Sequence, residues 1–98
     1  MFDLLIQNAQ VLDGTGAPEI AADVAVKDGK IAAVGKLSGE AAETVDGAGL
    51  TLAPGFIDVH GHSDLFMALD PARASKLLQG VTTELCGQCG LGPAPVSE

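Results

Sequence analysis

The chain has 98 residues, three of them aromatic and thirteen of them glycine, and its formal net charge is −8 at pH 7. This length allows at most one ordinary domain, with a modest hydrophobic core. Thirteen scattered acidic residues outnumber five basic ones, which argues against nucleic acid or an anionic membrane surface as a partner.

The sequence carries no sign of export. Its N-terminus lacks a basic segment followed by the apolar run of a signal peptide, and no stretch approaches the roughly 18 apolar residues of a membrane span. Disulfides are rare in reducing compartments, and the chain has only two cysteines. We therefore expect a cytoplasmic protein.

Residues 1–54 are predicted to form a small module of short β-strands. Phe2, Leu4 and Ile6 alternate with polar residues, which is the pattern of a strand with one buried face. Further short strands are expected in QVLDGTG, where a glycine turn follows, and on both sides of the glycine turn in ETVDGAGLTLAPG.

A β-hairpin is predicted in the stretch DVAVKDGKIAAVG. The pair Asp28-Gly29 suits a two-residue turn whose positions need positive φ angles. Closing the hairpin there places Val26 opposite Ile31 and Val24 opposite Ala33, so that one face of the hairpin is apolar.

The pattern changes in residues 55–98. FIDVH is predicted to be a strand buried on both sides, and VTTEL a second strand. Between them we expect a helix with Asp70 as N-cap, Pro71 at its first position and Gly80 after its end. A strand, a helix and a strand in this order form a βαβ unit with parallel strands, so the fold class is mixed α and β.

The only two histidines, His60 and His62, follow each other at the end of the first of these strands. Residues two apart in a strand face the same side, with Cα atoms about 6.5–7 Å apart. Gly61 between them leaves room, so one metal ion could bind both rings. The alternative is a pair of ordinary hydrogen-bonded histidines. Active sites of α/β barrels lie at the carboxyl ends of strands, which favours the metal site.

Cys86 and Cys89 have C-x-x-C spacing and follow the second strand, at the same rim as the histidines. A redox pair needs its first cysteine at a helix N-terminus, which the following glycines and prolines disfavour. A structural zinc site is disfavoured because one residue separates the histidines. The remaining alternative is one thiolate that joins the histidines while the other cysteine packs as a small apolar residue. Local sequence does not decide which cysteine is the ligand.

The stretch APGFIDVHGHSD resembles the first barrel strand of the amidohydrolase superfamily. QGVTTELCGQCGLGPAP is similar to the GVTT…G-x-C-G segment of N-acyl-D-amino-acid deacylases, also called D-aminoacylases. The resemblance covers almost the whole chain and implies an N-terminal fragment. Residues 1–54 would be a β-sandwich segment, and residues 55–98 the first βαβ unit of a metal-dependent (β/α)₈ TIM barrel, which takes roughly 250 residues when complete.

The resemblance also implies a site and an activity. His60, His62 and Cys89 would bind zinc, as one or two ions in the complete enzyme, while Cys86 matches no ligand position. The enzyme would hydrolyse the amide bond of N-acyl-D-amino acids to a carboxylate and a free D-amino acid. Because the carboxylate that moves protons belongs to a later strand, this fragment would contain no catalytic residue and would be inactive alone.

Several points stay open at this level. The alternatives to a deacylase are a cyclic-amide hydrolase of the same superfamily, similar to dihydroorotases and hydantoinases, and a small metal-binding or interaction module without catalysis. Asp58 either supports the histidines or is simply a hydrogen-bonded carboxylate, and Asp64 is expected to serve its loop. Open strand edges and apolar faces also predict self-association of the chain.

Overall fold

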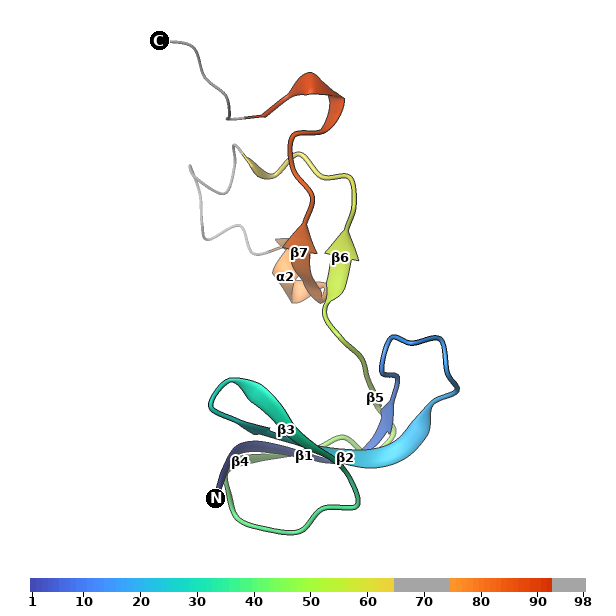
Figure 1. Ribbon diagram of the computed structural model, residues 1–98, viewed down its shortest axis with the longest axis vertical. Coiled ribbons are helices and arrows are strands. Elements are labelled where there is room, and N and C mark those ends of the chain that lie inside the picture. Colours follow the sequence, from blue (N-terminus) through green and yellow to red (C-terminus); the bar gives the residue numbers. More distant parts are fainter. Residues whose placement is uncertain (65–74, 93–98) are drawn as a thin grey trace. The chain divides into compact units, whose positions relative to one another are not determined.

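The structure, a computed structural model, describes residues 1–64 and 75–92 (Figure 1). Its contacts divide the chain into two compact units, Met1–Pro54 and Gly55–Glu98. That these units act as separate domains remains a prediction. Among the described residues, no helix has both the length and the apolar character needed to cross a membrane.

The first unit is a single mixed sheet (Figure 1). Its strands are β1 (Phe2–Val11), β2 (Ile20–Lys27), β3 (Lys30–Gly35), β4 (Ala41–Asp46) and β5 (Thr51–Leu52). Their order is β3-β2-β1-β4, with β5 also paired to β1. The hairpin strands are antiparallel, whereas β4 and β5 run parallel to β1. The prediction of a strand-rich segment is confirmed, and the described residues of this unit form a single sheet.

β1 corrects the prediction of two separate N-terminal strands. It continues through a bulge at Asn8, whose φ is 61°. The Asn8 backbone N–H donates to Asp23 Oδ1 at 2.8 Å, and its side-chain amide donates to Asp46 Oδ1 at 3.0 Å. A bulge adds one unpaired residue without ending the ladder. The strand therefore continues past Asn8, although the alternation of apolar and polar residues is interrupted there.

Burial in the sheet also differs from the prediction. Phe2, Leu4 and Ile6 are only half-buried, whereas Leu5, on the opposite face, is 2 % exposed. Leu5 pairs with residues of both β2 and β4, because β1 is a central strand. Small and β-branched residues supply the remaining core: Ala9, Val11, Ala22, Val24 and Ala25.

The hairpin turn is confirmed, with φ of 52° at Asp28 and 70° at Gly29. Val26 pairs with Ile31 as predicted. Val24, however, pairs with Val34 instead of Ala33, because the register shifts by one residue on β3. Val24 is 5 % exposed and Val26 is half-buried, whereas Ile31 is 70 % exposed, so the predicted apolar face is covered only in part within the described structure.

The second unit pairs β6 (Phe56–Asp58) with β7 (Val81–Glu84) in parallel, as predicted. The described helix, α2 (Ser75–Leu78), precedes β7 (Figure 1). It ends before Gly80, whose φ of 87° suits a residue without a Cβ. The predicted N-cap Asp70 and Pro71 lie outside the described residues. Phe56 and Ile57 are 61 % and 66 % exposed, so burial of β6 on both sides is wrong for the described part of the chain, which packs no element over them.

Candidate metal centre

The two histidines lie just beyond β6, which ends at Asp58. The prediction that they belong to the strand is therefore wrong. The cause is a turn in which the His60 backbone N–H donates to Asp58 Oδ1 at 3.1 Å. The rings of His60 and His62 nevertheless converge, with centroids 5.4 Å apart and planes at 74°.

Cys89 lies in η1 (Gln88–Gly90), a single turn after β7. Its Sγ is 3.4 Å from His60 Nε2, and one donor atom from each of His60, His62 and Cys89 lies within 4.8 Å of the others. All three residues are exposed. Cys89 has a φ of 57°, a left-handed conformation that is uncommon outside glycine.

Cys86 differs from Cys89 in its surroundings. Desolvation, followed by the negative charges of Asp64 and Glu84, raises the pKa of the Cys86 thiol. A raised pKa leaves less thiolate, the form that binds metal. Cys86 is also exposed, so its interpretation as a packing residue is wrong within the described structure.

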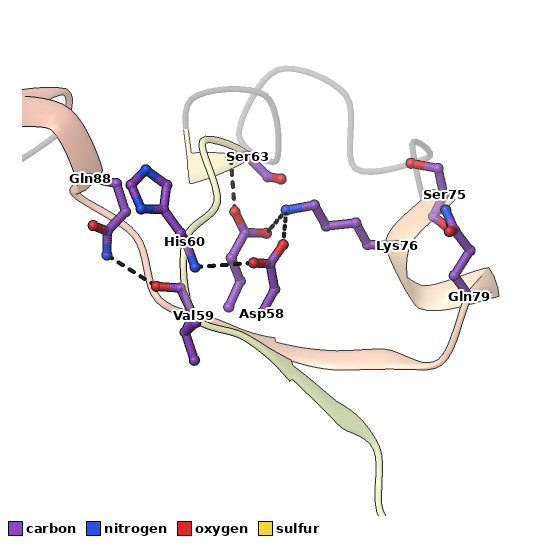
Figure 2. Close-up of polar contacts among 9 residues, drawn as sticks. Asp58, Val59, His60, Ser63, Ser75, Lys76, Gln79 and Gln88 are labelled. Carbon is purple, nitrogen blue, oxygen red and sulfur yellow. Dashed lines mark hydrogen bonds and ion pairs between the residues drawn. The ribbon is translucent and has the colours of Figure 1, made fainter.

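Hydrogen bonds of the Gln88 side chain and of the Gly87 backbone help to join the histidine and cysteine loops. The Gln88 side-chain amide donates to the carbonyl oxygen of Val59 at 3.4 Å (Figure 2). The Gly87 N–H donates to Asp64 Oδ2, also at 3.4 Å. Asp64 thus serves the loops, in agreement with the expectation from sequence.

A lysine and two carboxylates lie beneath the histidine loop. Asp58 and Glu84 are register partners on β6 and β7. Lys76, from α2, lies with its Nζ 2.7 Å from Asp58 Oδ2 and 3.0 Å from Glu84 Oε2 (Figure 2). We call these three residues the lysine–carboxylate cluster.

The hydrogen bonds of the cluster keep its members ionised. The Lys76 ammonium, followed by the His60 backbone N–H, lowers the pKa of Asp58. The Ser63 backbone N–H, followed by Lys76, lowers the pKa of Glu84. Hydrogen bonds to Asp58 and then to Glu84 raise the pKa of Lys76. At neutral pH the cluster therefore holds two negative charges and one positive charge.

Gly61 has a role that differs from the one expected. A Cβ at this position would lie 1.8 Å from Glu84 Oε1 and 2.3 Å from Glu84 Cδ. The missing side chain therefore makes room for the Glu84 carboxylate, beyond any space it leaves between the imidazoles.

Sequence reasoning missed Lys76 and Glu84. A glutamate in an otherwise uncharged strand, VTTEL, and a lysine in the last turn of the helix before it are weak signals. They become informative only when the parallel register places Glu84 beside Asp58.

Comparison with known proteins agrees with the motifs. Residues 1–55 match the family described as the urease alpha-subunit, N-terminal domain. Over 97 residues the chain is 44 % identical to the D-aminoacylase of Alcaligenes xylosoxydans xylosoxydans. The aligned region covers 98 % of this chain and 20 % of that relative. The chain belongs to the family of the urease alpha-subunit N-terminal domain, and over nearly its whole length it matches N-acyl-D-amino-acid deacylases.

Solved structures of deacylases match the chain as well. One is an N-acyl-D-glutamate deacylase from Bordetella bronchiseptica, complexed with zinc and a phosphonate mimic of the tetrahedral intermediate. It is 46 % identical to this chain, with a TM-score of 0.88. The match covers 97 % of this chain and 21 % of that deacylase. A D-aminoacylase described as having a binuclear metal centre is 42 % identical, with a TM-score of 0.92. The match covers 100 % of this chain and 21 % of that D-aminoacylase. The chain thus spans about a fifth of the length of these relatives.

Proposed function

We propose that His60, His62 and Cys89 bind zinc, and that the activity served by this site is the hydrolysis of N-acyl-D-amino acids to a carboxylate and a free D-amino acid. The observation that carries the proposal is the convergence of two imidazoles and one thiol within 4.8 Å, where two parallel strands end. The deacylase relatives supply the substrate class.

The donor set fits zinc. Zinc binds histidine nitrogen at about 2.0–2.1 Å and cysteine sulfur at about 2.3 Å, so neighbouring ligand atoms of a tetrahedral site lie roughly 3.4–3.6 Å apart. The distance of 3.4 Å from Cys89 Sγ to His60 Nε2 already has this value. The left-handed backbone of Cys89 supports the same assignment, because strained conformations persist at functional positions.

Bound zinc would polarise the amide carbonyl and lower the pKa of a bound water toward neutrality. The residues of this chain would hold the ion, with Asp58 and Glu84 fixing the loop that carries the histidines. We assign no catalytic acid or base to the described residues. We therefore expect the 98-residue chain alone to show no turnover.

The fold that we propose for this activity is a (β/α)₈ barrel. Its first unit would be formed by β6, α2 and β7 within residues 55–98, and residues 1–54 would contribute one layer of a β-sandwich. The parallel pairing of β6 with β7 supports this arrangement, because parallel strands need a crossover connection of the kind that α2 belongs to.

The test of the metal site is zinc per chain, measured by elemental analysis on the wild type and on Cys89→Ser, Cys86→Ser and His60→Ala variants. We expect zinc to be retained by the wild type and by Cys86→Ser, and to be lost from the other two. Equal loss in both cysteine variants would instead indicate a structural C-x-x-C zinc site.

The test of the reaction is a chimaera. The 98 residues replace the matching fifth of the Alcaligenes D-aminoacylase, and hydrolysis of N-acetyl-D-amino acids is measured. We expect turnover that is abolished by His60→Ala. A folded, zinc-loaded chimaera without turnover would contradict the proposed function.

A further inference from the structure

The lysine–carboxylate cluster uses both oxygens of each carboxylate. Asp58 Oδ2 and Glu84 Oε2 accept from Lys76 Nζ at 2.7 and 3.0 Å. Their other oxygens face the histidine loop. Asp58 Oδ1 accepts the His60 N–H at 3.1 Å, and Glu84 Oε1 accepts the Ser63 N–H at 3.0 Å.

These two backbone contacts bracket the metal-binding pair. His60 lies at one end of the bracketed segment and Ser63 at the other, with Gly61 and His62 between them. Fixing both ends of a four-residue segment leaves its backbone little freedom. The directions in which the two imidazoles leave the backbone are then restricted before any ion binds.

Lys76 holds this arrangement together. Without a cation, the carboxylates of Asp58 and Glu84 would repel each other, since they face each other on neighbouring strands. The side chain of Glu84 is 10 % exposed and that of Asp58 is 29 % exposed, so water screens their charges incompletely. Lys76 reaches from α2 to both, as Figure 2 shows for its contact with Asp58.

We propose that Lys76 is a positioning residue for the metal centre: through Asp58 and Glu84 it orders the His60–Ser63 loop in the conformation that binds the ion. The inference rests on the proposed function, since it takes His60 and His62 as ligands. Lys76 is not itself a ligand, because its ammonium is engaged by two carboxylates. Groups that orient ligating residues in this way change metal affinity by about 10–100-fold when they are removed.

The experiment compares the wild type with Lys76→Met and Lys76→Arg. Lys30→Met is the control, because it removes one positive charge from the other unit. Lys30 is an exposed residue of β3. Zinc dissociation constants are measured by competition with a chelating dye. Hydrogen exchange of the His60 and Ser63 amides is measured by NMR on the metal-free chains, with amides of β1 and β2 as a check that the first unit stays folded.

We expect Lys76→Met to weaken zinc binding by about 10–100-fold and to speed the exchange of both amides. Lys76→Arg is expected to keep part of the zinc affinity and part of the amide protection, because a guanidinium can bridge two carboxylates. Lys30→Met should change neither the zinc affinity nor the exchange of the two amides. Faster exchange with zinc affinity within twofold of the wild type would overturn the positioning role. Unchanged exchange in Lys76→Met would overturn the ordering of the loop, whatever its zinc affinity.

The same data separate the two proposals. A wild type that binds no zinc, or whose zinc affinity does not depend on His60, would overturn the proposed function and with it the role of Lys76 toward a metal. Tight, His60-dependent zinc binding that is indifferent to Lys76 would overturn only the positioning role of Lys76.

Discussion

A single methyl group at Gly61 would test how rigidly the histidine loop is held. The Cβ of a Gly61→Ala variant would lie 1.8 Å from Glu84 Oε1, whereas ordinary van der Waals contact begins at 3.4 Å. The carboxylate oxygen must therefore move by about 1.6 Å, or the loop must move instead. Either movement breaks the 3.0 Å hydrogen bond between the Ser63 N–H and Glu84.

Two separate effects are expected in this variant, one on folding and one on zinc binding. Gly61 is not among the glycines with positive φ, so its backbone accepts alanine. Alanine at such a position usually stabilises a protein by about 0.4–1 kcal/mol, because it restricts the unfolded chain. Loss of the Glu84 contact should weaken zinc binding by about 10–100-fold, which corresponds to about 1.4–2.7 kcal/mol. The stabilisation acts on folding and leaves the zinc affinity of the folded chain unchanged, so we expect Gly61→Ala to bind zinc more weakly.

The assay is zinc competition with a chelating dye, carried out in a double-mutant cycle. In a Glu84→Ala background the obstacle is gone, and Gly61→Ala should have no further effect on zinc affinity. The reasoning would be refuted if Gly61→Ala bound zinc within twofold of the wild type, or if it lost the same affinity in both backgrounds.

Three further predictions concern the fold and the cysteine turn. Leu5→Ala should lower the free energy of unfolding of the first unit by about 2–5 kcal/mol in urea titrations, because Leu5 is 2 % exposed; Leu50→Ala, at a site 61 % exposed, should change it by less than about 0.5 kcal/mol. Cys89→Gly should keep the turn, whose φ of 57° suits glycine, yet lose zinc; a variant that retained one zinc per chain would exclude Cys89 as a ligand. The lowered pKa values of Asp23 and Asp46 stabilise the sheet above the unfolded value of about 3.9. That stability should disappear as the pH falls through the folded pKa values, and Asp23→Asn should flatten the pH dependence of the unfolding midpoint.

The fold was predictable where one local signal determines one local structure. Asp28-Gly29 specifies its turn because both positions need positive φ, and this requirement belongs to the dipeptide itself. The bulge at Asn8 was not predictable in the same way. Its extra residue is held by Asp23 and Asp46, which come from two other strands, so no window of sequence contains the cause.

In the candidate site, too, the residues that were predicted are those with a local sequence signal. His60, His62 and Cys89 were found because their residue types and spacing carry metal chemistry and a family resemblance. Lys76 and Glu84 were missed, since a lysine on a helix and a glutamate in a strand usually face water. Their meaning depends on the pairing of Asp58 with Glu84, which is a property of the parallel register.

Polar contacts, rather than a hydrophobic core, organise the candidate metal centre in the described structure. Among residues 1–64 and 75–92, every buried apolar side chain belongs to the first unit. The loops that carry the donors are instead joined by Asp58, Glu84 and Lys76 on one side and by Asp64 and Gln88 on the other. Core substitutions such as Leu5→Ala should therefore reduce stability without changing zinc affinity. Substitutions in the lysine–carboxylate cluster should do the reverse, because the site draws its geometry from directional hydrogen bonds that fix each loop from its neighbour.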